Sequence, residues 1–197
     1  CRAGADGLVV PKAERPDDFV ALVTALEPVE KQLGRRPMQF VGLLETPGAI
    51  LDSRTIATAP RLMAMMTGGE DLALCLGAQP TPEVLRLPKL LVHYAAKAAG
   101  LMSLGMLRSV ADYADLDGIA SAAREAREHG FDGATCVHPA LVPVLNAAFS
   151  PNEAERDWAM RVVEAAEQNA GAFALDGRMI DAPVIARARS VLRNAGQ

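Results

Sequence analysis

Short apolar runs alternate with longer amphipathic stretches along most of the chain. The runs begin near residues 8, 40, 61, 101 and 134, and each is followed by turn residues or by a charge. Continuous apolar runs bounded by turn signals are typical of strands that are buried on both faces of a parallel sheet. The pattern therefore predicts five parallel strands.

The amphipathic stretches between these runs predict helices, because proline and acidic residues open them and glycine closes them. The predicted helices cover residues 16–33, 82–99 and 115–129, followed by Gly34, Gly100 and Gly130. Strands that alternate with helices at this spacing indicate βαβ units. The fold class is therefore predicted to be α/β with a parallel sheet.

The alternation of short apolar runs with amphipathic stretches ends after the fifth apolar run. A helix is predicted from residue 150 to about residue 170 with Ser150 as its N-cap, then a short segment over 171–181, then a final helix over 183–194. These residues have no further strand to cover, so they predict a separate appendage. We expect a sheet-and-helix part over 1–149 and a C-terminal helical segment over 150–197.

Composition narrows the class of protein. Half of the 197 residues are apolar and 22% are charged, which excludes a disordered chain. The net charge of −4 argues against a nucleic-acid partner, and the apolar runs are too short to predict a membrane span. Cys1, Cys75 and Cys136 lie in apolar contexts without a zinc-ligand spacing, so they are interpreted as buried free thiols. The chain is expected to be cytoplasmic.

Acidic residues follow two consecutive predicted strands. Glu45 comes directly after one apolar run, and Asp71 follows the next run along the chain. The carboxyl ends of parallel strands meet at one side of the sheet, so the two carboxylates should converge there. Paired carboxylates with open water positions suit Mg²⁺. The alternative is that both residues cap helices, since each lies at the start of a helical stretch.

Two further polar residues end predicted strands. Lys12 is compatible with a Schiff-base amine, with binding of a carboxylate, or with a salt bridge to Glu14, and the structural role is favoured. His138 is compatible with an acid or base, and a ring held by a hydrogen bond at the strand end is the more common outcome.

Six segments, in order along nearly the whole chain, resemble a known family: Val10–Glu14, Leu44–Gly48, Gly68–Ala73, Gly130–Pro139, Phe149–Pro151 and Leu175–Asp181. They are similar to the citrate lyase beta-subunit-like family, which is grouped with the malyl-CoA lyases and the class II 2-keto acid aldolases.

The resemblance implies a TIM (β/α)8 barrel with a C-terminal helical lid, of which residues 1–149 would supply strands four to eight. It implies Mg²⁺ held by Glu45 and Asp71. It also implies cleavage or formation of a carbon–carbon bond between a CoA-thioester acetyl unit and a small 2-oxo acid. Asp181 matches the family's lid aspartate and would move a proton at the acetyl carbon. A homo-oligomer, trimer or hexamer, would exchange lids between neighbouring subunits.

Three other hypotheses about the function remain open. They are a CoA-independent 2-keto acid aldolase, a malyl-CoA-type thioesterase and a non-catalytic CoA-binding subunit. The family's first three strands, with an arginine that clamps the substrate carboxylate, have no counterpart in the 197 residues. Five strands do not close a barrel that needs eight. We therefore expect a longer protein or a second chain that completes the barrel.

Overall fold

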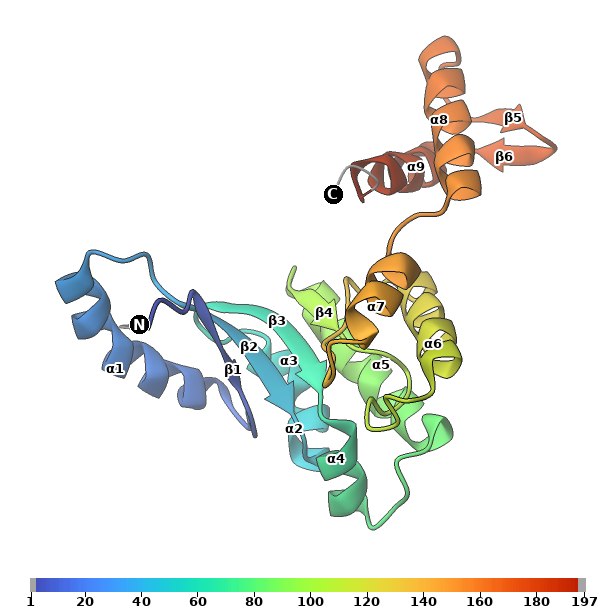
Figure 1. Cartoon of the computed structure of the whole chain (residues 1–197). Helices are drawn as coiled ribbons and strands as arrows, with labels where there is room; N and C mark the ends of the chain where they lie inside the picture. Colours follow the sequence, from blue (N-terminus) through green and yellow to red (C-terminus); the bar gives the residue numbers. More distant parts are fainter. Residues whose placement is uncertain (1–2, 195–197) are drawn as a thin grey trace. The chain divides into compact units, whose positions relative to one another are not determined.

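The structure, a computed structural model, describes residues 3–194. The chain divides after Leu145 into two compact units, which are described separately. In chain order the elements are β1 (Gly7–Val10), α1 (Pro16–Leu33), β2 (Gln39–Leu44), α2 (Pro47–Leu51), α3 (Ser53–Ile56), β3 (Leu62–Thr67), α4 (Gly69–Leu76), α5 (Pro82–Ala98), β4 (Met102–Leu104), α6 (Leu116–Glu128), α7 (Leu141–Phe149), α8 (Glu153–Gln168), β5 (Phe173–Leu175), β6 (Arg178–Ile180) and α9 (Ala182–Asn194) (Figure 1).

The first unit is built on a parallel sheet in the order β1-β2-β3-β4, so the predicted α/β class is confirmed. Sequential order with helical crossovers is the arrangement of βαβ units. Four of the five predicted strands form. The fifth is reduced to one parallel bridge between Leu104 and Gly133. Because β4 itself has only three residues, it offers the following segment little backbone to pair with.

The predicted helices over 16–33, 82–99 and 115–129 appear as α1, α5 and α6, with ends shifted by one residue at most. Gly34 ends α1 in the left-handed conformation with φ 60°, as a C-terminal glycine does. Helix α1 buries Phe19 against Phe40 of β2, with ring centroids 5.9 Å apart. Both rings are fully buried, and each burial stabilises the fold by about 1.5–3 kcal/mol.

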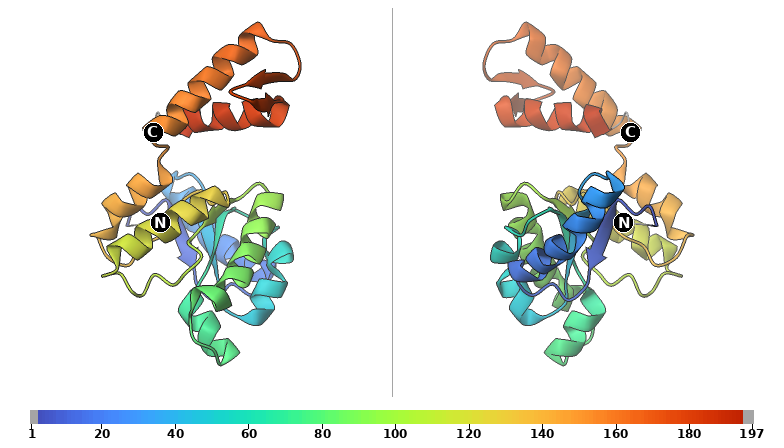
Figure 2. Two further views of the ribbon diagram at one scale, coloured as in Figure 1. Left: turned by 90° about the vertical axis from the view of Figure 1, so that its right-hand side faces the viewer. Right: turned by 90° about the vertical axis from the view of Figure 1, so that its left-hand side faces the viewer.

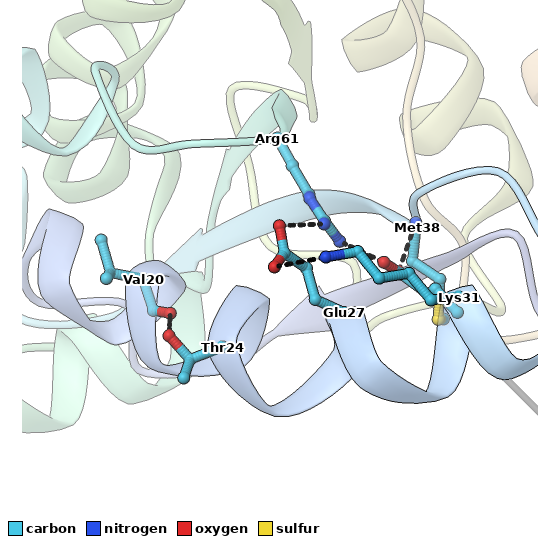
Figure 3. Close-up of polar contacts among 7 residues, drawn as sticks. Val20, Thr24, Glu27, Lys31, Met38 and Arg61 are labelled. Carbon is cyan, nitrogen blue, oxygen red and sulfur yellow. Dashed lines mark hydrogen bonds and ion pairs between the residues drawn. The ribbon is translucent and has the colours of Figure 1, made fainter.

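A buried carboxylate joins the end of α1 to the strands. Glu30 accepts a hydrogen bond of 2.8 Å from the backbone N–H of Met38. Arg61, before β3, donates to both carboxylate oxygens of Glu30 at 2.9 Å. The exposed Glu27 lies 3.7 Å from Arg61 and 3.6 Å from Lys31 (Figure 3). The hydrogen bond from Met38, with a further contribution from Arg61, lowers the pKa of Glu30.

We predict that Glu30→Gln lowers the thermal unfolding midpoint at neutral pH. A lowered pKa in the folded state gives stability that is present above the usual value of 4.5 and is lost as the pH falls through the folded pKa. The gap between parent and variant should therefore narrow in acid, as measured by calorimetric scans from pH 7 to pH 3. Glu27→Gln is the control with little expected change, because surface ion pairs contribute little. A gap that stays constant down to pH 3 would contradict the prediction.

The cysteine prediction is partly wrong. Cys75 and Cys136 are free, but Cys75 is exposed and Cys136 is half-buried. Helix α4 buries Leu72 and Ala73, which places Cys75 on its outer side. Cys1 lies outside the described residues. Within residues 3–194, none of the helices combines the length and the apolar character that crossing a bilayer requires.

The second unit contains α8, the antiparallel pair β5–β6, and α9 (Figure 2). Its small core is formed by Ala159, Val162, Ile180 and Ala188. The segment over 171–181, predicted only as a short segment between two helices, contains the β5–β6 hairpin, which places Ile180 in this core. The predicted N-cap Ser150 is wrong: Asn152 caps α8 by accepting from the backbone N–H of Glu155 at 2.9 Å. Glu155 completes a capping box, which favours this start over Ser150.

Candidate active site

A cavity of about 310 Å³ lies in the first unit and is lined by residues at the carboxyl ends of β2 and β3. Figure 1 shows these strands, with α2 following β2 and α4 following β3. The residues that line the cavity are Leu43, Glu45, Met66, Thr67, Gly68, Gly69, Glu70, Asp71, Lys89, Gly105, Met106, Ser109, Val110, Thr135 and Val137. They come from four successive βα units of the chain, because all parallel strands deliver their carboxyl ends to the same side. The structure thus brings the predicted pair, Glu45 and Asp71, into one cavity.

Glu45 is held in a fixed position. It follows the last residue of β2, is only 6% exposed, and accepts a hydrogen bond of 2.9 Å from the backbone N–H of Lys12. Gly68 packs directly against it, since a Cβ at Gly68 would lie 2.6 Å from Glu45 Cγ. Only glycine leaves room for the carboxylate at this point, so Gly68 is part of the construction of the site.

Burial raises the pKa of Glu45, and the neighbouring carboxylate of Asp71 raises it further. The hydrogen bond from Lys12 acts in the opposite direction. Two carboxylates that disfavour each other's charge are relieved by a cation between them. The helix-capping alternative does not explain Glu45, because the N-cap of α2 is Thr46, whose hydroxyl accepts from Ala49 at 3.2 Å.

Asp71 lies in the first turn of α4, after the N-cap Gly68. It is exposed, and it shares the cavity with Glu70, whose carboxylate accepts a hydrogen bond from the Ser109 hydroxyl. No group of three or more histidine, cysteine, aspartate or glutamate side chains suited to a metal occurs within residues 3–194. The donor set is therefore two carboxylates that line one cavity, which fits Mg²⁺ because that ion keeps several waters or ligand oxygens.

Lys12 and Glu14 form no salt bridge in the described part of the chain, so the favoured prediction of that salt bridge is wrong. Lys12 contributes its backbone N–H to Glu45, and Glu14 instead accepts from the Thr46 hydroxyl at 2.8 Å. Lys12 has φ 51°, so the chain turns sharply after β1 and aims that N–H at the carboxylate. The predicted structural role at this strand end is thus performed by the backbone of Lys12.

His138 is exposed and lies outside the residues that line the cavity. Its Nδ1 accepts a hydrogen bond of 3.1 Å from the backbone N–H of Ala140. Its ring stacks on Tyr113 with centroids 5.1 Å apart. The His138 ring is thus held by a hydrogen bond, which is the outcome that the sequence favours.

Asp181 belongs to the second unit. It precedes α9, is half-buried, and its Oδ1 accepts from the backbone N–H of Val184 at 3.3 Å. This contact is an N-cap, which uses one carboxylate oxygen and leaves the other for additional contacts. Within its own unit, Asp181 therefore has a helix-capping role that sequence reasoning did not predict.

Lys89 is the cavity residue that sequence reasoning missed. It lies on α5, is 6% exposed, and continues the buried helix face of Leu85 and Val92. A signal was present, because residues 85, 89 and 92 share one face of a helix and a lysine on such a face is uncommon. Burial lowers the pKa of Lys89 to about 8, against an opposing effect of Glu70.

A parallel βα sheet with two carboxylates that follow consecutive strands and line one cavity defines an α/β protein with a candidate metal site. The comparisons with known proteins place it more closely: residues 1–139 match the HpcH/HpaI aldolase/citrate lyase family, and the chain belongs to that family. The structural relatives include the citrate lyase beta subunit of Mycobacterium tuberculosis, with a TM-score of 0.62.

Three relatives illustrate the match. A citrate lyase subunit beta-like protein of Mycobacterium tuberculosis is 32% identical over 96% of this chain and 67% of its own. A (3S)-malyl-CoA thioesterase of Cereibacter sphaeroides is 33% identical over 98% of this chain and 66% of its own. The crystal structure of protein CitE from M. tuberculosis in complex with magnesium, acetoacetate and coenzyme A has a TM-score of 0.81 at 32% identity, covering 98% of this chain and 69% of that one. The chain thus spans about two thirds of the length of these relatives.

Proposed function

We propose that this protein is a Mg²⁺-dependent carbon–carbon lyase of the citrate lyase beta-subunit type. It would cleave or form the bond between a CoA-thioester acetyl unit and a small 2-oxo acid. The observation that carries the proposal is the meeting of Glu45 and Asp71 in one strand-end cavity of a chain from this family. The magnesium, acetoacetate and coenzyme A bound by the M. tuberculosis relative support it.

The described residues suit the parts of this chemistry that a protein must provide. Glu45 and Asp71 would hold Mg²⁺, which when bound polarises the carbonyl of the 2-oxo acid as a Lewis acid. The hydrogen bond from Lys12 and the close packing of Gly68 orient Glu45 for this role. Fixed ligands matter because they avoid reorganisation during the reaction.

Asp181 is proposed as the proton-transfer residue. In the direction of bond formation it would take a proton from the acetyl methyl carbon of the thioester, and in cleavage it would return that proton. We propose that Asp181 acts in the cavity of a neighbouring subunit. The protein would then be a homo-oligomer whose subunits exchange lids. We also propose that the enzyme is cytoplasmic. The domain division at about residue 150 belongs to the same proposal, with the second unit as the lid.

A thioesterase is the second candidate, favoured by the 33% identity to the malyl-CoA thioesterase of C. sphaeroides. Both reactions start from a similar acyl-CoA, and they differ in the bond that breaks. A lyase breaks the carbon–carbon bond and releases acetyl-CoA with a 2-oxo acid. A thioesterase breaks the carbon–sulfur bond by adding water and releases CoA with the intact hydroxy acid.

The test is to incubate the protein with malyl-CoA, citramalyl-CoA and citryl-CoA in the presence of Mg²⁺ and to identify the products by mass spectrometry. We expect acetyl-CoA and the matching 2-oxo acid, and we expect the reaction to stop with EDTA and to recover with added Mg²⁺. Free CoA with an intact hydroxy acid would replace the lyase by the thioesterase. Absence of turnover of all three thioesters with Mg²⁺ would overturn both enzymatic readings.

A further inference from the structure

Lys89 lies on helix α5 and lines the cavity. It lies near the middle of α5, and its stem passes the start of α4: a Cβ at Gly69 would lie 3.7 Å from Lys89 Cε. Glu70 and Asp71 follow Gly69 directly. The side chain therefore enters the cavity beside the acidic residues, although it belongs to a different βα unit from Glu45.

The Lys89 ammonium has no hydrogen-bond or ion-pair partner in the described part of the chain, and its electrostatic interaction is with Glu70. Within residues 3–194, Lys89 forms neither a hydrogen bond nor an ion pair, and the nearby Glu70 is hydrogen-bonded to Ser109. No fully buried side-chain nitrogen or oxygen in this range lacks a partner, so the Nζ atom of Lys89 keeps some accessible surface. Since 94% of the residue is covered and it lines the cavity, we place that surface in the cavity.

Carboxylates outnumber cations among the side chains that line the cavity, and outside this lining Lys12 also lowers the pKa of Glu45. Of its lining residues, three carry carboxylates, namely Glu45, Glu70 and Asp71, while Lys89 is the single cationic side chain among them. A divalent cation at Glu45 and Asp71 would bring the balance to neutrality, and an anionic molecule could then enter without net repulsion. Without Lys89, the lining side chains and the divalent cation together would carry an excess of negative charge.

We propose that Lys89 binds an anionic oxygen of the 2-oxo acid in this cavity. The inference rests on the proposed function, because that function supplies the anionic substrate class. A buried ammonium without a hydrogen-bond partner is costly, and a carboxylate oxygen from the substrate would offset that cost with a charge-assisted hydrogen bond. The competing interpretation is that Lys89 only neutralises Glu70 and stabilises the start of α4.

Lys89→Met tests the proposal, because methionine has a similar length without the charge. We expect calorimetric titration with pyruvate, at saturating Mg²⁺, to show affinity reduced by roughly 10- to 100-fold, the range for a hydrogen bond to a charged group. Mg²⁺ affinity without pyruvate should be unchanged or higher, because a nearby positive charge is removed. Lys89→Arg should retain most of the pyruvate affinity. Lys97→Met is the matched control, since Lys97 is on the same helix and pairs with Asp132 at 2.7 Å.

The outcomes separate the two levels of the proposal. A parent protein that does not bind Mg²⁺ would overturn the proposed function, and the role of Lys89 with it. A parent that binds Mg²⁺ and pyruvate, with a Lys89→Met variant that binds pyruvate equally well, would overturn the role of Lys89 alone. A lower unfolding temperature in Lys89→Met together with unchanged pyruvate affinity would establish the competing structural role. Lys89→Gln serves as the second neutral variant if Lys89→Met does not fold.

Discussion

Glu45→Gln is expected to remove Mg²⁺ binding, with the dissociation constant raised by at least about 100-fold. Loss of a partner that only orients a ligand costs about 10- to 100-fold in metal affinity, so loss of a direct ligand should cost at least the upper end. Glutamine keeps the shape of glutamate, and its amide oxygen can still accept from the backbone N–H of Lys12. Calorimetric titration with Mg²⁺ measures this loss. Equal Mg²⁺ affinity in parent and variant would remove Glu45 from the metal site.

The same substitution is expected to leave the metal-free fold intact or to stabilise it at neutral pH. The pKa of Glu45 is raised in the folded state, chiefly by burial. Such a group contributes stability that is present below its usual pKa of 4.5 and is lost as the pH rises through the folded pKa. The charged form of Glu45 is therefore disfavoured in the folded protein, and Glu45→Gln removes that charge. Thermal unfolding with and without Mg²⁺ distinguishes loss of a ligand from loss of the fold.

Gly68→Ala provides an independent control, because it moves Glu45 without changing any candidate ligand. The added Cβ would overlap Glu45 Cγ at 2.6 Å and Oε1 at 2.8 Å, so the carboxylate must shift. We expect a weaker Mg²⁺ affinity than in the parent, and a smaller loss than in Glu45→Gln. This intermediate result would tie the affinity to the position of the carboxylate.

The parts of the fold that depend on local sequence could be predicted. The apolar runs of β2 and β3 and the glycine at the end of α1 determine these elements within their own segments. The fifth strand was not predictable in this way. Its apolar pattern is that of a strand, but whether it pairs depends on β4, which has only three residues. Strand pairing is a tertiary property, and local propensity does not decide it.

In the candidate site too, some residues could be predicted from the sequence, whereas others depend on tertiary packing. Glu45 and Asp71 could be predicted because parallel topology places all carboxyl strand ends together, whatever the details of packing. The positions of Gly68 and Lys89 could not be derived so directly. Gly68 matters through a side chain from another strand, and Lys89 through a cavity that forms only when α5 packs behind α4. Asp181 lies in the second unit, and its proposed role depends on assembly between subunits.

Asp181→Asn is expected to reduce lyase turnover by a factor on the order of 10²–10⁴, the usual contribution of a general acid or base. Asparagine is as good an N-cap as aspartate, and it can still accept from the N–H of Val184. The start of α9, the Mg²⁺ affinity and the CoA affinity should therefore be preserved. Turnover is measured with the thioester on which the parent acts.

Asp176→Asn is the matched control for a lost charge in the second unit. Asp176 lies between β5 and β6 with φ 50° and pairs with Arg161 at 2.6 Å, and asparagine tolerates that backbone conformation. We expect nearly parental turnover for this variant. Unchanged turnover in Asp181→Asn would remove Asp181 from the chemistry and leave it as a helix cap.

Lid exchange predicts a specific result for a mixture of Glu45→Gln and Asp181→Asn subunits. If Asp181 completes the cavity of a neighbouring subunit, an oligomer assembled from Glu45→Gln and Asp181→Asn subunits contains some sites with both native residues. Co-refolding the two inactive variants should then restore measurable turnover, whereas each variant refolded alone should stay inactive. If Asp181 acts within its own subunit, every site lacks one of the two residues and the mixture stays inactive. Complementation therefore distinguishes action between subunits from action within one, independently of which thioester is the substrate.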